Sequence, residues 1–321
     1  MKGMVTQGAV LLTAGPMSLS MIASALSDYE VGEKNTGTGW EFGDPAVVVP
    51  LRCDPRGRVI IDYVARPWPD GMGDPQNEFT LFGAWSMGHF GPFTYPRGLE
   101  RAVQQAWNWR EARDVVPRHD GFIRLKTTYV GGPNDLVIPE GYNALAELNE
   151  VTAITVRLST VPGVLCYFNP NGETLYLPTA LAENFKWNAS KNLPSVNLWT
   201  NVRMFNLANQ VPGWFMMDTV GMWQLDLPDQ EVVHPDGAFD PDEVAGFLRD
   251  ISVYLVQNGR VIKDGDTTDG PGGIRWQAFS SYEGVIPPPR ETLRWYPENG
   301  VDRPRALAPK ERPQKESKPQ Q

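Results

Sequence analysis

The acidic, glycine-rich run VIKDGDTTDGPGG at residues 261–273 holds the residue types that could do chemistry. Asp264, Asp266 and Thr268 form an Asp-x-Asp-x-Thr pattern, in which a first Asp can attack phosphorus beside magnesium. That chemistry needs the pattern at the end of the first strand of a parallel sheet, and only 53 residues follow Thr268. We therefore interpret the run as a turn whose glycines supply positive backbone angles, and a metal site of Asp264 and Asp266 is the alternative.

Two other ligand sites do not fit this run. A calcium loop that starts at Asp264 would need glycine at its sixth position and Glu at its twelfth, where Asp269 and Arg275 stand. A phosphate loop would need Gly-Lys-Ser or Gly-Lys-Thr, which the sequence lacks.

The histidines and cysteines give only weak catalytic signals. His89, His119 and His234 lie in three separate segments without metal-ligand spacing. His119-Asp120 is the best acid–base pair, yet adjacent side chains usually point apart. Cys166, in GVLCYF, is typical of a buried strand. We predict no catalytic residue and no cofactor.

The candidate residues lie on two similar series of predicted strands and helices. Each reads as β-α-β-β-α-β, and the last helix, Asp240 to Gln257, has a marked start because Asp240 can cap it and Pro241 suits its first turn. We predict an α+β fold of two such halves, in which helices pack mixed or antiparallel sheets. The halves are residues 1–135 and 136–298 of one compact unit, followed by a disordered tail at 299–321.

The N-terminus, the cysteines and the apolar segments indicate where in the cell the protein is located. An apolar stretch near the N-terminus could pass for a signal peptide, but Gly15-Pro16 interrupts it, so we expect strand, turn and helix. Cys53 and Cys166 favour two buried thiols in a reducing compartment, with a single bridge as the alternative. No segment is apolar for long enough to span a membrane. We predict a cytoplasmic protein.

The charge distribution limits the kinds of partner. The formal net charge is −9, and six basic against three acidic residues from Asp302 onward leave −12 on residues 1–301. Nucleic-acid binding draws most of its affinity from neutralised phosphates, so an acidic body argues against it. A basic protein partner is more consistent with this charge.

Acidic and aromatic residues remain conspicuous. From Asp218 to Asp250 nine acids accompany one base, which indicates either helix caps and a solvated face or an acidic recognition surface. The aromatic loop at 66–96 is either a lid over the core or a set of interface anchors. The residues that we select for partner binding are Asp226, Asp229, Glu231, Asp236, Asp240, Asp242, Trp68 and Trp85.

Several segments resemble a known family. They are LPSVNLWTNVRMF, DTVGMWQLDLPDQEV and FLRDISVYLVQNGRVIKDGDTT, preceded by a helix carrying AWNWREARDVVPRHDGFIRL. In this succession the chain resembles the bacterial domain-of-unknown-function family 4261, from about residue 8 to residue 296. The long loop at 66–96 departs from the family pattern, and the family name implies no activity.

Three classes of function follow from these observations. The first is a non-enzymatic acidic binding protein, and within it we favour a bacterial immunity protein that occludes a secreted toxin of the type VI kind, such as a nuclease. The second is a metal- or phosphate-dependent hydrolase that uses Asp264, Asp266 and His119. The third is a structural accessory of a secretion system. The sequence gives neither the identity of the partner nor the oligomeric state.

Overall fold

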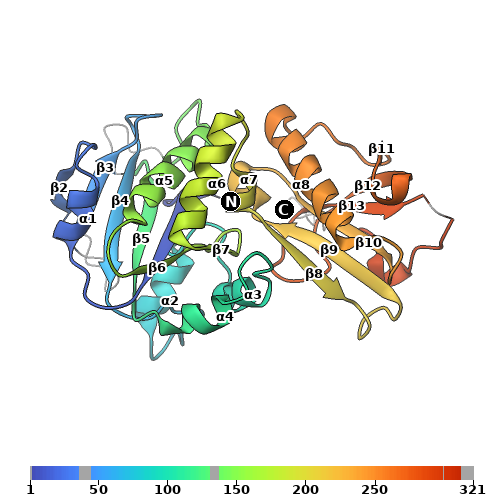
Figure 1. Cartoon of the computed structure of the whole chain (residues 1–321), viewed down its shortest axis with the longest axis horizontal. Coiled ribbons are helices and arrows are strands. Elements are labelled where there is room, and N and C mark those ends of the chain that lie inside the picture. The colour runs from blue at the N-terminus through green and yellow to red at the C-terminus, as the bar shows by residue number, and fades with distance from the viewer. Residues whose placement is uncertain (1, 36–44, 131–136, 299, 312–321) are drawn as a thin grey trace, which may run out of the picture. The chain divides into compact units, whose positions relative to one another are not determined.

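The fold is taken from a computed structural model, which describes residues 2–35, 45–130, 137–298 and 300–311. The chain forms two compact units, each with its own sheet and helices, and this is the predicted α+β class (Figure 1). Unit 1 consists of Met1–Asn201 and Val220–Asp226, and unit 2 consists of Val202–Thr219 and Leu227–Gln321.

The sheet of unit 1 has seven strands in the order β2-β3-β4-β5-β1-β6-β7, and every pairing in it is antiparallel. β1 lies near its centre, and all seven of its residues are buried. The strands are β1 (Gln7–Thr13), β2 (Gly32–Asn35), β3 (Ala46–Pro50), β4 (Arg58–Val64), β5 (Gly121–Thr128), β6 (Val164–Asn169) and β7 (Thr174–Tyr176).

Helices cover both faces of this sheet. α5 and α6 lie on one face, and the aromatic core on the other face is closed by α2, α3 and α4 (Figure 1). The N-terminal segment forms β1, a turn and α1, as the sequence predicts. The helices of unit 1 are α1 (Leu19–Ala25), α2 (Phe79–Ser86), α3 (Gly98–Gln104), α4 (Ala112–Val115), α5 (Ala144–Leu158), α6 (Pro178–Ser190) and α7 (Val196–Trp199).

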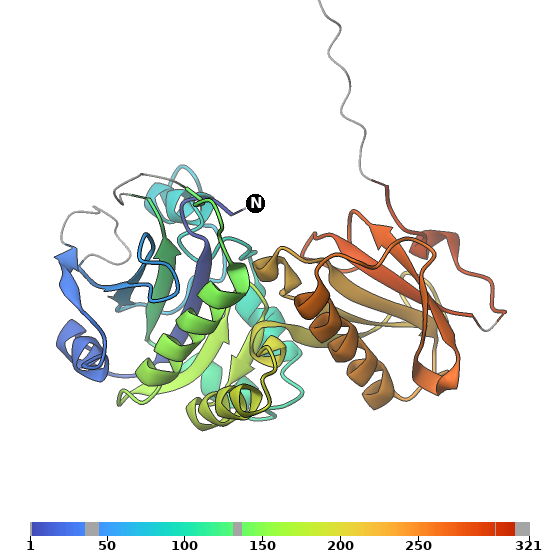
Figure 2. The same ribbon diagram turned by 90° about the horizontal axis from the view of Figure 1, so that it is seen from above.

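Unit 2 contains a six-stranded sheet in the order β11-β12-β13-β10-β9-β8, in which β10 and β13 are parallel. α8 (Pro241–Asn258) packs on the face that carries Met217, Val232 and Trp295 (Figure 2). Its start is as predicted, because the Asp240 carboxylate accepts a hydrogen bond from the amide of Asp242. The strands are β8 (Asn201–Asn206), β9 (Trp214–Val220), β10 (Asp229–Pro235), β11 (Thr267–Asp269), β12 (Arg275–Ser281) and β13 (Thr292–Pro297).

Residues 220–226 return from unit 2 to unit 1. Gln224 holds this segment, since its amide donates to the carbonyl of Trp199 at 2.9 Å. The backbone at Gly172 approaches the same carbonyl of Trp199 so closely that a Cβ on this residue would lie 1.8 Å from the oxygen. Glycine is therefore required at Gly172, within the Asn-Gly turn signal of the sequence.

Two boundaries of the fold differ from the sequence prediction. The division expected after residue 135 falls inside unit 1, where β6 pairs with β1. The expected disordered tail at 299–321 is partly ordered, because Leu307 is buried and its carbonyl accepts a hydrogen bond from Arg294. Residues 299 and 312–321 lie outside the described part of the chain. Within that part, no helix is long and apolar enough to cross a membrane.

Candidate functional site

Four exposed carboxylates gather where β10 leads into α8. They belong to Asp236, Asp240, Asp242 and Glu243, which we call the acidic edge. Asp240 caps the helix, and Glu243 accepts a hydrogen bond from the amide of Gly272 at 3.1 Å. The positive end of the helix dipole stabilises such charges. The backbone beneath the acidic edge is thus held at two points.

The aromatic side chain of Phe239, within the same segment, anchors the acidic edge to unit 2. The Phe239 ring lies between His234 and Trp276, with ring centroids 5.3 and 5.0 Å away. A Cβ on Gly272 would lie 2.8 Å from the Phe239 ring, so only glycine lets the neighbouring turn come this close. Burial lowers the pKa of His234, so its imidazole packs there in the neutral form.

Two residues selected for partner binding lie in the interior and not on the acidic edge. Asp229 is 1% exposed and Glu231 is fully buried. The alternation of polar and apolar residues along β10 suggested a solvated face, but that face of the sheet is covered by residues 283–290 and by Leu307. These two carboxylates cannot belong to a recognition surface of the folded unit.

Asp229 and Glu231 belong to a buried set of paired charges, which we call the charged stripe. It crosses neighbouring strands, because Glu231 is in register with both Asp218 of β9 and Arg294 of β13. Every member is at least 96% buried, and three arginines match three carboxylates. The members of the stripe are Arg203, Asp218, Asp229, Glu231, Arg290 and Arg294.

Arg290 joins the carboxylates of the charged stripe. Its guanidinium pairs with Asp218 and lies 3.5 Å from a carboxylate oxygen of Asp229. Burial alone would lower the pKa of Arg290, but the charges of Asp218, Asp229 and Glu231 outweigh it, and the pKa is raised. The stripe is therefore a set of fixed, mutually neutralised charges, and proton transfer is not the chemistry that it favours.

The other selected residues lie in unit 1. Asp226 is exposed, and its carboxylate pairs with the Lys2 ammonium at 2.7 Å. Trp68 and Trp85 are only 5% and 7% exposed, and both pack against Phe90 in the aromatic core. The loop at 66–96 is thus a lid at these positions, and the two tryptophans are not interface anchors. They were selected because a loop rich in aromatic residues resembles an interface in composition.

The Asp264–Gly273 run contains turns, which the sequence favours, on both sides of the short strand β11. Asp264 accepts a hydrogen bond from the amide of Ser280 at 2.6 Å, and Asp266 accepts one from the amide of Lys263 at 2.8 Å. Both carboxylates thus fasten backbone. Within the described residues, no group of three or more His, Cys, Asp or Glu side chains is arranged to hold a metal ion.

The predicted acid–base pair does not form either. His119 Nε2 accepts a hydrogen bond from the amide of Trp68 at 2.9 Å, which leaves Nδ1 to donate to the carbonyl of Val116. The Asp120 carboxylate accepts from the amide of Gly15 instead. His119 belongs to unit 1 and the Asp264 turn to unit 2. Each of these groups has a local structural role.

The cysteines are free thiols, and one of them differs from expectation. Cys166 is buried as predicted, whereas Cys53 is exposed because its amide and that of Arg52 bind Glu150 at the surface. Although the residue is exposed, partial desolvation of its thiol and the nearby Glu150 raise the pKa of Cys53 to about 12. The thiolate that a nucleophile requires is therefore disfavoured.

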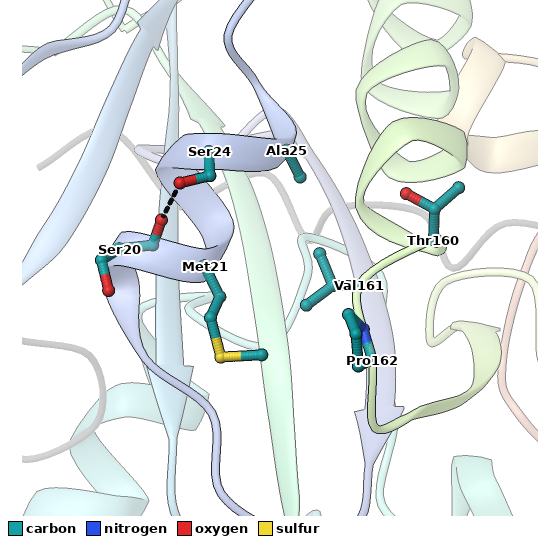
Figure 3. Close-up of a pocket in the computed structure, with 7 residues that line it drawn as sticks. All are labelled: Ser20, Met21, Ser24, Ala25, Thr160, Val161 and Pro162. Atoms are coloured by element: carbon teal, nitrogen blue, oxygen red, sulfur yellow. Dashed lines mark hydrogen bonds between the residues drawn. The ribbon is translucent and has the colours of Figure 1, made fainter.

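A groove of about 480 Å³ lies on unit 1 between α1 and the segment after α5. Figure 3 shows the α1 side chains on one wall and Thr160, Val161 and Pro162 on the other. The Ser24 hydroxyl donates to the carbonyl of Ser20, and the seven lining residues carry no charge. The groove holds none of the predicted site residues. Its α1 wall consists of Ser20, Met21, Ser24 and Ala25.

Comparison with known proteins identifies one region. Residues 218–296 match the family model described as Domain of unknown function (DUF4261). We call these residues, which are similar to that family, the DUF4261 region. The match confirms the predicted resemblance over these residues, which run from β9 to β13, although the prediction extended from residue 8. Searches of curated proteins and of solved structures found no match.

The DUF4261 region contains five of the six members of the charged stripe, all except Arg203. Sequence reasoning missed all three arginines of the stripe. Arg203 and Asp218 are 15 residues apart, and Arg290 and Asp218 are 72 apart, so no local pattern links them. One available signal was that Arg294 lies inside a strand rich in apolar and aromatic residues, which is typical of a paired, buried charge.

Proposed function

We propose that the protein is a binding protein that recognises a basic protein partner through the acidic edge. The observation that carries this proposal is the exposure of four carboxylates on a backbone fixed by Asp240 and Glu243. No basic residue occurs in residues 236–243. Such a negative patch raises the rate of association with a cationic surface, and its fixed backbone limits the entropy lost on binding.

The roles of the other carboxylates support binding over acid–base chemistry. Those of the charged stripe are matched by arginines, and those of Asp264 and Asp266 accept backbone amides. The carboxylates of both sets thus have structural roles in unit 2. The acidic edge, at the start of α8, is exposed and can contact a partner.

In its finer form, the proposal is that the chain is an immunity protein that occludes a secreted toxin. A nuclease toxin must carry cationic side chains to bind phosphates. The carboxylates of the acidic edge would then occupy the positions that phosphates take in the substrate. This form predicts a cytoplasmic complex of one toxin domain with one copy of the chain.

Co-expression with the product of the adjacent gene tests the proposal. We expect a stable complex on size-exclusion chromatography, and loss of the partner's toxicity when the two are made together. The acidic-edge variant Asp236→Lys with Asp242→Lys should weaken the complex. The matched control is Glu111→Lys with Asp114→Lys, which reverses two exposed acids in unit 1. Equal binding by both variants would contradict the proposal, as would the absence of any complex.

The hydrolase alternative has a separate test. It would require Asp264 and Asp266 to release the amides of Ser280 and Lys263 before they could bind metal or phosphate. Activity on a phosphate ester that disappears in Asp266→Asn, with unchanged folding, would favour the hydrolase. No observation on the described residues favours it or a role in a secretion system.

A further inference from the structure

The outer face of α8, which continues from the acidic edge, contains a glycine that packing does not explain. Gly246 lies inside the helix, and in the described part of the chain a Cβ on it would meet no atom within 4 Å beyond its two neighbours and the helix backbone. Alanine would therefore fit. A glycine inside a helix is less favourable than alanine, because it loses more conformational freedom on folding. No close contact among the described residues requires this glycine, although it lowers the stability of the helix.

Gly246 forms a notch in a row of residues along the exposed face of α8, while the buried side chains of the helix pack on the sheet. Residues four apart are neighbours on a helix surface, with Cβ positions about 6 Å apart. The missing side chain therefore leaves a gap between two carboxylates of this row, which we call the α8 row. Its members are Asp242, Gly246, Asp250 and Tyr254.

The charge around the notch is negative. Asp242 and Asp250 are exposed, and among the described residues neither carboxylate has a hydrogen bond or an ion pair. Residues 236–258 hold five acids and a single base, Arg249, which lies outside the α8 row. Such a surface attracts a cationic group more strongly than a neutral or an anionic one.

The aromatic residue of the α8 row indicates which cation fits. Tyr254 is 47% exposed and lies one turn beyond Asp250. Side chains of a helix lean toward its N-terminus, so that the Tyr254 ring covers the turn that carries Asp250. A planar guanidinium can pair with a carboxylate through its edge and stack on an aromatic ring, whereas an ammonium is a compact, strongly hydrated charge. Arginine therefore fits better than lysine.

We propose that the notch at Gly246 admits an arginine side chain of the basic partner, whose guanidinium pairs with Asp250 and stacks on Tyr254. Without a Cβ at Gly246, the aliphatic stem of the arginine can lie directly on the helix backbone. This inference rests on the proposed function, because it takes the partner of the acidic edge as the source of the arginine. It extends that contact from the acidic edge along α8.

An arginine peptide provides the probe. Fluorescence anisotropy of labelled hexa-arginine, titrated with the full chain at low salt, should show tighter binding than hexa-lysine. Gly246→Gln fills the notch and keeps every carboxylate, and it should weaken the binding of hexa-arginine by at least about fivefold. The matched control is Gly83→Gln, at an interior glycine of α2 where a Cβ would also meet no atom within 4 Å in the described chain. It should bind hexa-arginine like wild type.

Two measurements separate binding from folding. The melting temperatures of Gly246→Gln and Gly83→Gln should both rise by a few degrees, because glutamine is a better helix former than glycine. A loss of binding by Gly246→Gln is then not a loss of structure. Asp250→Asn should weaken the binding of hexa-arginine to a similar extent, whereas Asp114→Asn, at an exposed acid of α4, should not. If Gly246→Gln does not fold, Asp250→Asn takes its place.

Equal affinity of wild type and Gly246→Gln for hexa-arginine would overturn the inference. So would equal binding of the two peptides, or no binding of either. The proposed function has a different readout, which is the complex with the adjacent-gene product. If Asp236→Lys with Asp242→Lys weakens that complex and Gly246→Gln does not, the inference fails and the proposed function stands.

Discussion

Replacing Glu231 by Gln should lower the free energy of unfolding of unit 2 by about 3–5 kcal/mol. The Glu231 side chain is fully buried and accepts hydrogen bonds from Arg294 Nε at 2.9 Å and from the amide of Val285 at 2.8 Å. Glutamine conserves the shape but removes the charge, and its NH₂ group would face donors. The substitution therefore removes the negative charge and the hydrogen bonds to one of the two oxygens, while it keeps the volume of the side chain.

The size of the effect follows from what remains around Arg294. Its guanidinium is still buried and still donates to the carbonyls of Leu307, Ala308 and Glu283. These acceptors are neutral, so the arginine becomes an unpaired buried charge. A loss of about 3–5 kcal/mol is a large share of the roughly 5–15 kcal/mol that stabilises a typical domain.

Urea unfolding followed by tryptophan fluorescence would measure this loss, because Trp276 and Trp295 lie in the core of unit 2. The control is Glu183→Gln, at an exposed glutamate of α6 in unit 1, and it should change the free energy by less than about 0.5 kcal/mol. Replacing Glu231 and Arg294 together by Leu and Met should be far less harmful than Glu231→Gln alone. If Glu231→Gln unfolds like the control, the charged stripe does not stabilise the sheet as argued.

Three further changes test other contacts. An exposed histidine has a pKa of about 6.5, and that of His89 is lowered to about 3, so the unfolded chain binds a proton that the folded chain does not. The free energy of unfolding should therefore fall as the pH drops from about 6.5 towards 3. His89→Gln should flatten this dependence, and urea titrations at several pH values would measure it. Asp266→Asn keeps an acceptor for the amide of Lys263 and should cost less than about 1 kcal/mol, whereas a large loss would show that the charge is needed. Truncation after Asp302 removes Leu307, which caps the Arg294 guanidinium, and should lower the melting temperature by several degrees, while truncation after Glu311 should leave it unchanged.

Local signals in the sequence predicted the elements well. Asp240, Pro241 and Glu243 marked the start of α8, and Gly15-Pro16 separated β1 from α1. The turn at Asp264 could also be predicted, because glycine readily adopts the positive φ angles of turns and an Asp-Gly pair favours a turn. Each of these predictions depends on interactions within a few residues of the signal.

The candidate site was harder to predict because burial depends on distant partners. Asp229 and Glu231 alternate with apolar residues, as on a half-exposed strand, and only Arg290 and Arg294 show that the polar face is internal. Trp68 was misread for the same reason, since the strands that it covers lie elsewhere in the sequence. Asp236, Asp240 and Asp242 are exposed as expected, and their role in binding a partner stays a prediction.

The ionic-strength dependence of the association rate tests the central claim most directly. Surface plasmon resonance or stopped-flow measurements with the adjacent-gene product should give a rate for wild type that falls steeply between low and physiological salt. The variant Asp236→Lys with Asp242→Lys should associate at least about tenfold more slowly at low salt and with a flatter dependence, and Glu111→Lys with Asp114→Lys should stay close to wild type. Identical salt dependence for all three proteins would mean that the acidic edge does not guide the partner.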